Sequence, residues 1–310
     1  MKFGWSRLVH LWRKYEAFRA GFYAAAGATA ALYLTQNAQR SAGEDLRTRG
    51  VVTAAELVRD PQPPSQPPSG YEPRSLVGQP IAGSVRTFDG FVCAYDRRTR
   101  IPLWVMEHLT PDRLGQVGSD LHSSEPIDRS QFDFYEDLAE SILFRATNED
   151  YLGSGFDRGH MAAAGNHRFD RSAMSQTFIL SNIAPQVGHG FNRNAWNDLE
   201  KYIRAIARKS HNVVVVTGPL FLPRPIGGKK YVTYEVIGPN NVAVPTHFFK
   251  AIAIQERPDT PWEVRAWAMP NEALKGKVKL RDYQVPLNAV ESAAGLQIFP
   301  GIDRQTQRLR

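Results

Sequence analysis

The sequence contains a single cysteine, Cys93, among its 310 residues. One thiol can form neither an intrachain disulfide nor a cysteine-rich zinc site, so a disulfide-stabilised scaffold and a zinc finger are both excluded. The histidines also lack the HExxH spacing that is typical of zinc hydrolases. Apart from His160, only His189 lies near a candidate site. Cys93 itself is expected to be a small apolar residue in a strand.

The sequence also has little excess charge outside its N-terminal end. The formal net charge is +7, but residues 1–42 contain six basic residues and one acid, Glu16. The remaining positions therefore share 32 basic and 30 acidic residues. Because this main part is nearly neutral, it cannot bind a polyanion through overall charge. Any phosphate-binding site has to be a local basic patch.

Residues 1–42 resemble a mitochondrial presequence, because scattered basic residues accompany apolar residues at amphipathic spacing. Residues 20–39 contain no charge and are long enough to cross a bilayer, although alanine and glycine dominate them and their end is polar. We predict a mitochondrial targeting segment with a candidate membrane anchor that would associate with the inner membrane. A secretory signal is the competing interpretation, which the long basic lead-in disfavours.

Residues 43–78 form a predicted flexible, proline-rich linker. Residues 60–73 contain six prolines in fourteen positions, and such a segment stays extended without a core of its own. A spacer explains this composition better than a recognition motif for a proline-binding module. The predicted catalytic domain then occupies residues 79–305.

From about residue 80 the pattern predicts an α+β domain built on a mixed, mostly antiparallel sheet with flanking helices. The runs at 88–95 and 101–108 flank the polar turn at 96–100 and predict a hairpin. A helix is predicted over 193–208, where apolar residues recur at steps of three and four, with Asn192 as its cap. Further strands are predicted at 177–183, 213–221, 231–237, 242–254 and 264–269.

The segment Phe156–His160 reads FDRGH and gathers polar residues around a glycine. A histidine beside an aspartate and an arginine suits a general base that faces an anionic substrate. In the alternative interpretation, Asp157 and Arg158 form a surface ion pair and His160 is a satisfied core or loop histidine. Taken alone, the motif favours this alternative.

The segment Ser181–Glu200, SNIAPQVGHGFNRNAWNDLE, adds amide side chains and one acid downstream. Positions 192, 196 and 200 fall on one side of a helix, so Asn192 and Glu200 can face the same site. Alternatively, Asn192 and Asn194 only cap the helix, Asn182 closes a turn and Glu200 is a solvated residue.

Together, DRGH, SNIAPQ and FNRNAWNDLE resemble the DNA/RNA non-specific endonuclease family, and TGPLFLP at 217–223 and VPTHFFK at 244–250 extend the similarity over about residues 80–300. The resemblance implies a ββα-metal finger as the active site. It also implies a nuclease that acts on DNA and RNA without preference for sugar or sequence and leaves 5′-phosphate and 3′-hydroxyl ends. A homodimer in the mitochondrial intermembrane space and a role in DNA degradation, including that of apoptosis, are implied as well.

The resemblance further assigns roles to individual residues. It makes His160 the general base and Asn192 the side chain that holds Mg²⁺, for which Mn²⁺ can substitute. Arg158, Asn182 and Glu200 are placed around the scissile phosphate. Asparagine would leave the ion its full charge, and a neutral imidazole can accept a proton from water. We predict substrate contacts, each also explicable as an ordinary surface or structural residue, at Asp157, Arg97, Arg98, Arg100 and Gln186, with Arg168 and Arg171 as further phosphate contacts.

Two other functions remain open at this point. A non-catalytic mitochondrial protein that binds or tethers DNA could retain the fold, but it would have no need of both His160 and Asn192. A secreted or periplasmic nuclease would differ in where residues 1–42 direct a reporter protein. Both alternatives rank below a mitochondrial nuclease.

Overall fold

The computed structural model describes residues 83–115 and 127–302, which all belong to the unit Gln79–Arg310. The predicted targeting segment, its candidate anchor at 20–39 and the proline-rich linker lie outside the described residues. Within the described ranges, no helix has the length and apolar character needed to cross a bilayer.

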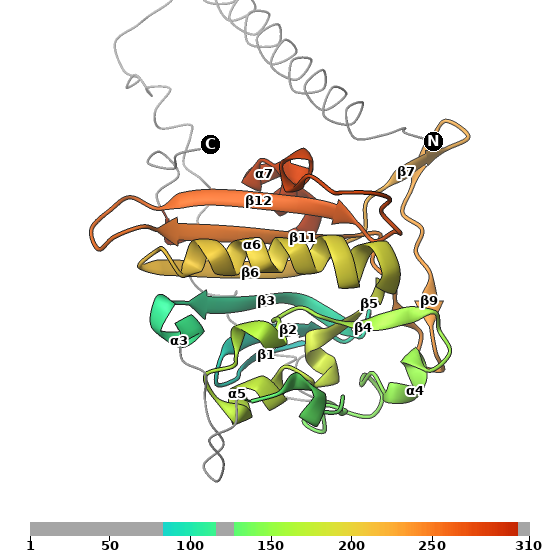
Figure 1. Ribbon diagram of the computed structural model, residues 1–310. Helices are drawn as coiled ribbons and strands as arrows, with labels where there is room; N and C mark the ends of the chain where they lie inside the picture. Colours follow the sequence, from blue (N-terminus) through green and yellow to red (C-terminus); the bar gives the residue numbers. More distant parts are fainter. Residues whose placement is uncertain (1–82, 116–126, 303–310) are drawn as a thin grey trace, which may run out of the picture. The chain divides into compact units, whose positions relative to one another are not determined.

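A seven-stranded sheet forms the centre of the unit (Figure 1). Its neighbouring strands all run antiparallel, as the sequence predicts. The two longest pairings join β6 to β11 and β11 to β12, and buried aliphatic residues dominate all three strands. The order across the sheet is β1 (Gly83–Thr87), β2 (Phe91–Asp96), β3 (Ile101–Leu109), β6 (Asn212–Leu220), β11 (His247–Gln255), β12 (Glu263–Pro270) and β13 (Gln284–Val285).

The predicted hairpin is confirmed as β2 and β3. Its turn is closed by the side chain of Asp96, which accepts hydrogen bonds from the Arg98 amide at 2.9 Å and the Thr99 hydroxyl at 2.7 Å. Arg100 ends the turn with φ of 57°, and its amide donates to the Asp96 carbonyl. These local bonds fix the register of the pair.

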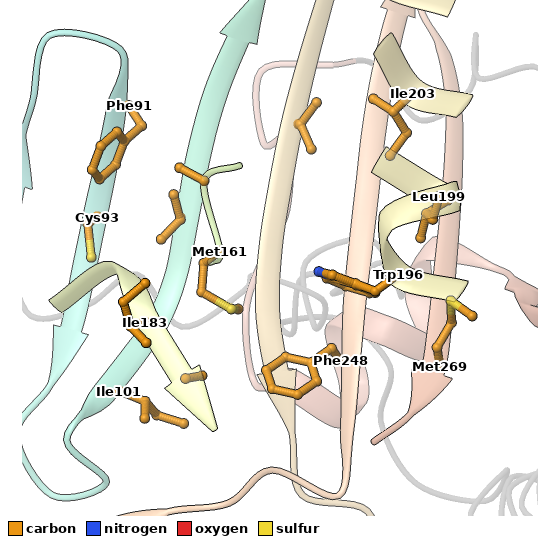
Figure 2. Close-up of a cluster of buried hydrophobic side chains, with 14 of the residues drawn as sticks. Phe91, Cys93, Ile101, Met161, Ile183, Trp196, Leu199, Ile203, Phe248 and Met269 are labelled. Atoms are coloured by element: carbon orange, nitrogen blue, oxygen red, sulfur yellow. The ribbon is translucent and has the colours of Figure 1, made fainter. Parts of the chain in front are cut away.

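The predicted long helix is confirmed in two parts. Gly188–Trp196 forms the irregular helical segment η5, and α6 continues over Asn197–Ala207 across one face of the sheet (Figure 1). The apolar face of α6 is buried through Leu199 and Ile203, which join Trp196 and Phe248 in the core between helix and sheet (Figure 2). This packing, rather than helix propensity, holds the polar face of α6 in place.

Shorter elements surround this core. The strands β4 and β5 pair as an antiparallel ribbon outside the main sheet, and α7 packs against β12. The remaining elements are α3 (Pro111–Gly115), η2 (Arg129–Gln131), α4 (Asn148–Tyr151), β4 (Phe156–His160), η3 (Ala164–Asn166), α5 (Arg171–Gln176), η4 (Leu180–Asn182), β5 (Ile183–Val187), β7 (Arg224–Ile226), β8 (Lys229–Tyr231), β9 (Val236–Ile237), β10 (Val242–Ala243), η6 (Leu280–Tyr283) and α7 (Leu287–Ala294).

Three strand predictions need correction. The run 177–183 is not a strand, because Thr177 ends α5 and residues 180–182 form η4; β5 begins only at Ile183. A short buried apolar run does not distinguish strand from helical turn. The single strands predicted over 231–237 and 242–254 are each divided, the first into β8 and β9 and the second into β10 and β11. Pro245, which lacks a backbone donor, lies in the second gap.

Candidate active site

A cavity of about 750 Å³ lies where β4, η5 and α6 come together. Its walls combine His160, Asn192 and Glu200 with Asp157. The register of β4 with β5 places His160 opposite Ile183, at the end of the ribbon that follows η4, whereas Asp157 lies near the other end, where β5 leads into η5. Six cations also line the cavity, and we call them the cationic rim: Arg129, Arg158, Arg168, Arg193, Lys201 and Arg204.

His160 is a buried imidazole with an unused nitrogen. Its side chain lies against Phe134 and Phe178, with ring centroids 5.2 Å and 4.8 Å away, and only 8% of the residue is exposed. Its Nε2 has no hydrogen-bond partner among the described residues. Burial, together with the positive charges of Arg129 and His167, lowers the pKa of His160 to about 3. The interpretation as a satisfied core histidine is therefore wrong, because a neutral ring lines the cavity with Nε2 unbonded.

Asn192 is oriented by Asp157. The Asn192 Nδ2 donates to Asp157 Oδ2 at 2.9 Å, and Arg193 donates to both oxygens of the same carboxylate. Although partial burial opposes ionisation, the hydrogen bonds from Arg193 and Asn192 lower the pKa of Asp157. With Nδ2 engaged, the Asn192 Oδ1 remains as an acceptor at the cavity. The alternative ion pair between Asp157 and Arg158 is wrong, because the structure pairs Asp157 with Arg193.

The predicted cap role of Asn192 is also wrong. The chain turns at Gly190, whose φ is 87°, and the backbone is helical from Phe191 onward, so Asn192 already lies inside the helix. A Cβ at Gly190 would approach the Leu274 amide nitrogen to 2.8 Å, so both the dihedral and the packing require glycine. Asn194, not Asn192, accepts from the Gly190 amide, at 2.8 Å.

Glu200 lies half-buried on α6 and faces the cavity. Its carboxylate has no hydrogen bond or ion pair within residues 83–115 and 127–302. Burial raises its pKa, although the charges of Lys250 and Arg204 act in the opposite direction. An unpartnered carboxylate and an amide oxygen at one cavity suit a hydrated divalent cation. No cluster of three or more His, Cys, Asp or Glu suited to a metal exists in this part of the chain, so such an ion would have few protein ligands.

The Arg158 side chain is held by contacts within the protein. Its Nη1 donates to Asn148 Oδ1 at 2.6 Å, and its guanidinium lies 4.5 Å from the centroid of Phe134. Of the rest of the cationic rim, the sequence predicted only Arg168. One signal in the sequence indicates two more of its members, because Arg193, Asn197, Glu200 and Arg204 recur at steps of three and four on one helical face.

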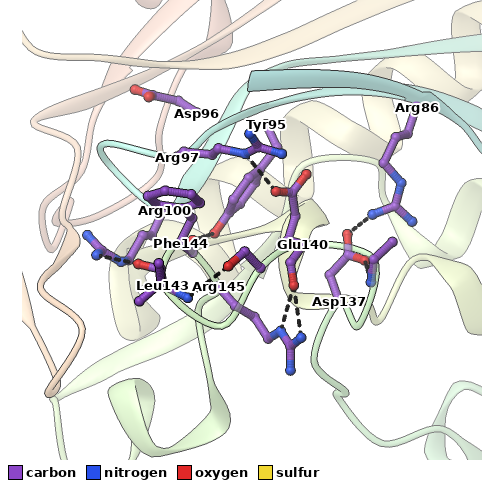
Figure 3. A network of polar contacts seen from close by, with 12 residues as sticks. Arg86, Tyr95, Asp96, Arg97, Arg100, Asp137, Glu140, Leu143, Phe144 and Arg145 are labelled. Atoms are coloured by element: carbon purple, nitrogen blue, oxygen red, sulfur yellow. Dashed lines mark hydrogen bonds and ion pairs between the residues drawn. The ribbon is translucent and has the colours of Figure 1, made fainter. Parts of the chain in front are cut away.

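Six predicted site residues do not line the cavity, and one of them, Arg171, donates a hydrogen bond to Gln131 Oε1 at 2.6 Å. Two of the three arginines of the β2–β3 turn, Arg97 and Arg100, make other contacts (Figure 3). Arg97 Nε donates to Glu140 at 2.8 Å and Arg100 Nη2 donates to the Leu143 carbonyl at 3.1 Å, while the Arg98 side chain is 81% exposed. Arg97, Arg98 and Arg100 therefore do not line this cavity, and their contact with substrate stays a prediction.

The remaining two, Asn182 and Gln186, are fully buried. Asn182 Oδ1 accepts from the Ala162 amide at 2.9 Å, and its Nδ2 donates to the carbonyls of Ala162 and Thr177. Gln186 packs against Gly159, where an added Cβ would lie 2.2 Å from the Gln186 Oε1. Asn182 thus holds the backbone just after His160, and Gln186 packs against β4 at Gly159, so both have a structural role here.

We expect Asn182→Ala to destabilise the fold by about 2–4 kcal/mol, because three hydrogen bonds to buried backbone groups are lost. Denaturant unfolding monitored by circular dichroism measures this change. An unfolding free energy equal to that of the wild type would contradict the structural role.

The low pKa of His160 predicts acid-sensitive stability. The ring stays neutral in the folded chain to about pH 3, whereas in the unfolded chain it has the ordinary histidine pKa of 6.5. The unfolded state therefore binds more protons between these values, and stability falls as the pH falls through that window. By pH 4 this one group lowers the unfolding free energy by about 3 kcal/mol relative to pH 7. His160→Phe removes the titration and should flatten the measured dependence; an unchanged slope would refute the assignment.

The sequence of this chain is similar to those of known nucleases. A family model described as DNA/RNA non-specific endonuclease matches residues 74–305. Mitochondrial endonuclease G of Caenorhabditis elegans is 49% identical over 227 residues, covering 73% of this chain and 71% of that protein. The Bos taurus protein of the same name is 45% identical over 280 residues, covering 89% and 90%.

Solved structures agree. The crystal structure of an EndoG/EndoGI complex matches with a TM-score of 0.68 and 46% identity, and the alignment covers 74% of this chain and 91% of that one. The family resemblance seen in the motifs is therefore confirmed, and so is the α+β fold. This chain belongs to the DNA/RNA non-specific endonuclease family.

Proposed function

We propose that this protein hydrolyses phosphodiester bonds of DNA and RNA, with His160 as general base and with Mg²⁺ held by Asn192. One observation carries the proposal: a neutral imidazole with an unbonded Nε2 and an oriented carboxamide line a single cavity that the cationic rim surrounds. A general base, charge stabilisation and a fixed substrate position are what phosphodiester hydrolysis requires.

The proton transfer follows from the state of His160. Water gives a proton to Nε2 as its oxygen attacks phosphorus, the bond from phosphorus to the 3′ oxygen breaks, and the departing 3′ oxygen takes a proton from a water molecule. The products would carry 5′-phosphate and 3′-hydroxyl ends. Phe134 and Phe178 hold the ring by packing, so little reorganisation accompanies the transfer.

The protein groups suit a single hydrated ion. Asn192 Oδ1 would bind it directly, and the unpartnered Glu200 carboxylate would orient water around it from the second shell. When bound, Mg²⁺ or Mn²⁺ supplies positive charge for the phosphate and the departing oxygen. Asp157 acts through Asn192, because it accepts the Nδ2 hydrogen bond that fixes the amide.

The cationic rim explains the absence of sequence preference. Arg158 and the five other cations address phosphate oxygens, which are the same in every sequence and in both sugars. The charge of Arg158 is already positioned by Asn148, so it can stabilise the extra negative charge of the transition state.

Mitochondrial placement is part of the proposal. Residues 1–42 have the composition of a presequence, and the two relatives described above carry the word mitochondrial in their names. We propose import with residues 1–42 as transit peptide, residence in the intermembrane space or at the inner membrane, and assembly as a homodimer. Fusion of residues 1–42 to a fluorescent reporter would separate this from secretion.

The activity is tested by incubating the full chain with plasmid DNA and with RNA, each with Mg²⁺ and with EDTA. We expect both polymers to be cleaved only when the cation is present. A polynucleotide kinase should label the new 5′ ends only after a phosphatase has removed their phosphates. Equal cleavage in EDTA would exclude the metal, and intact substrates in every condition would favour a protein that only binds or tethers nucleic acid.

A further inference from the structure

A buried chain of polar side chains connects the central sheet to the cavity. Glu107 on β3 accepts a hydrogen bond at Oε1 from Asn166 Nδ2, at 2.8 Å. Asn166, at the end of η3, accepts at Oδ1 from Arg204 Nη1, at 2.9 Å. Arg204 belongs to the cationic rim, so two hydrogen bonds join a core carboxylate to a cavity cation.

The chemistry of Glu107 fixes which way the Asn166 amide points. Burial opposes the charge of Glu107, but the hydrogen bond from His167 and the charges of His167 and Lys250 lower its pKa, so it is a carboxylate that can only accept. Asn166 Nδ2 must therefore face Glu107, and Oδ1 must face Arg204. Glu107 and Asn166 are 1% and 6% exposed, so water cannot readily replace either bond.

Gly165 provides the space for this arrangement. A Cβ there would lie 3.3 Å from Arg204 Nη1, so the guanidinium would have to give by a few tenths of an ångström. Because Gly165 has no side chain, the Arg204 guanidinium can approach Asn166 Oδ1.

The position of Arg204 has a consequence for Glu200. Glutamate and arginine four residues apart on a helix commonly form an ion pair. Across the described ranges Glu200 and Arg204 form none, and Arg204 Nη1 donates to Asn166 Oδ1 instead. Glu200 consequently retains an unpartnered carboxylate at the cavity.

We infer that Asn166 is a positioning residue that, held by Glu107, keeps Arg204 apart from Glu200. The carboxylate then remains available for the hydrated cation, and the guanidinium remains available for a substrate phosphate. This inference rests on the proposed nuclease function and adds a residue that contacts neither substrate nor metal.

The test is a double-mutant cycle on the full-length protein. Asn166→Ala should lower kcat about tenfold and raise the Mg²⁺ concentration for half-maximal activity, since Arg204 would turn to Glu200. In an Arg204→Ala background the same change should have no further effect on either quantity. A purely structural role predicts that the two losses in kcat multiply, and that result would overturn the inference.

Two further variants keep the test decisive. Gly165→Ala shifts the guanidinium slightly without removing any hydrogen-bonding group, so it should lower kcat less than Asn166→Ala does and have no further effect beside Arg204→Ala. Asn212→Ala is the matched control, because it also breaks two side-chain hydrogen bonds, to His108 and Gln255, on the edge of β6. It should leave kcat and the Mg²⁺ dependence unchanged.

The outcomes separate the two claims. If the wild type cleaves neither DNA nor RNA, the proposed function fails. If the wild type cleaves both while Asn166→Ala and Gly165→Ala match Asn212→Ala in kcat and in Mg²⁺ dependence, the positioning role alone fails.

Discussion

His160→Ala should reduce kcat by about 10²–10⁴-fold, because the variant lacks the one neutral imidazole that lines the cavity and can accept the proton of the attacking water. Substrate affinity should change little, since the cationic rim that binds phosphate is intact. Single-turnover cleavage of a labelled DNA duplex measures the chemical step, and a filter-binding titration without divalent cation measures the affinity.

Added imidazole provides the control for this prediction. A cavity of about 750 Å³ beside the vacated side chain has room for the free base, so millimolar imidazole should restore part of the lost rate. Loss of activity without any rescue, accompanied by an equal loss of affinity, would show that His160 supports the binding surface instead of the chemistry.

The second large effect is expected from Asn192→Ala. Removing the carboxamide oxygen should raise the Mg²⁺ concentration for half-maximal activity by at least about 10²-fold, because changes even to outer-shell groups cost 10–100-fold in metal affinity. Activity as a function of Mg²⁺ concentration, and Mn²⁺ binding followed by electron paramagnetic resonance, both report this change.

Asn194→Ala is the matched control for Asn192→Ala. It removes the amide that accepts from the Gly190 backbone, at 2.8 Å, two residues farther along the same segment. Stability should fall by about 1 kcal/mol while the Mg²⁺ dependence stays as in the wild type. Similar Mg²⁺ curves for the two variants would mean that Asn192 acts only through the local fold.

The sequence predicted the elements whose pattern is long and periodic. The hairpin β2–β3, the strands β6 and β12 and the helix α6 follow from repeated apolar positions. The short ribbon strand β5 was misplaced, because the buried run before it reads equally well as a strand or as helical turns. Local sequence does not carry the tertiary contacts that decide between them.

The candidate site was predictable only where chemistry is concentrated in a motif. His160 and Asn192 come from two segments that the motif pattern joins, and the structure brings both to one cavity. The sequence gives no signal for Arg129, because this residue lies about thirty residues before FDRGH. Only the tertiary fold brings it to the cationic rim. The arginines of the β2–β3 turn were predicted as substrate contacts from their charge alone.

Polar residues inside a motif need not touch substrate. Asn182 and Gln186 lie within SNIAPQ, yet both side chains are buried. The side-chain amide of Asn182 forms its hydrogen bonds with backbone groups. Asp157, in contrast, orients Asn192 and pairs with Arg193. Burial and hydrogen-bond partners distinguish these cases, and spacing along the chain does not.

The most direct test is a crystal structure of His160→Ala with a short DNA duplex and Mn²⁺, with the ion located by its anomalous scattering. We expect one peak in contact with Asn192 Oδ1 and a phosphate oxygen, with the space left by the imidazole on the opposite side of that phosphorus. Two peaks bridged by carboxylates, or a single peak away from Asn192, would contradict the mechanism.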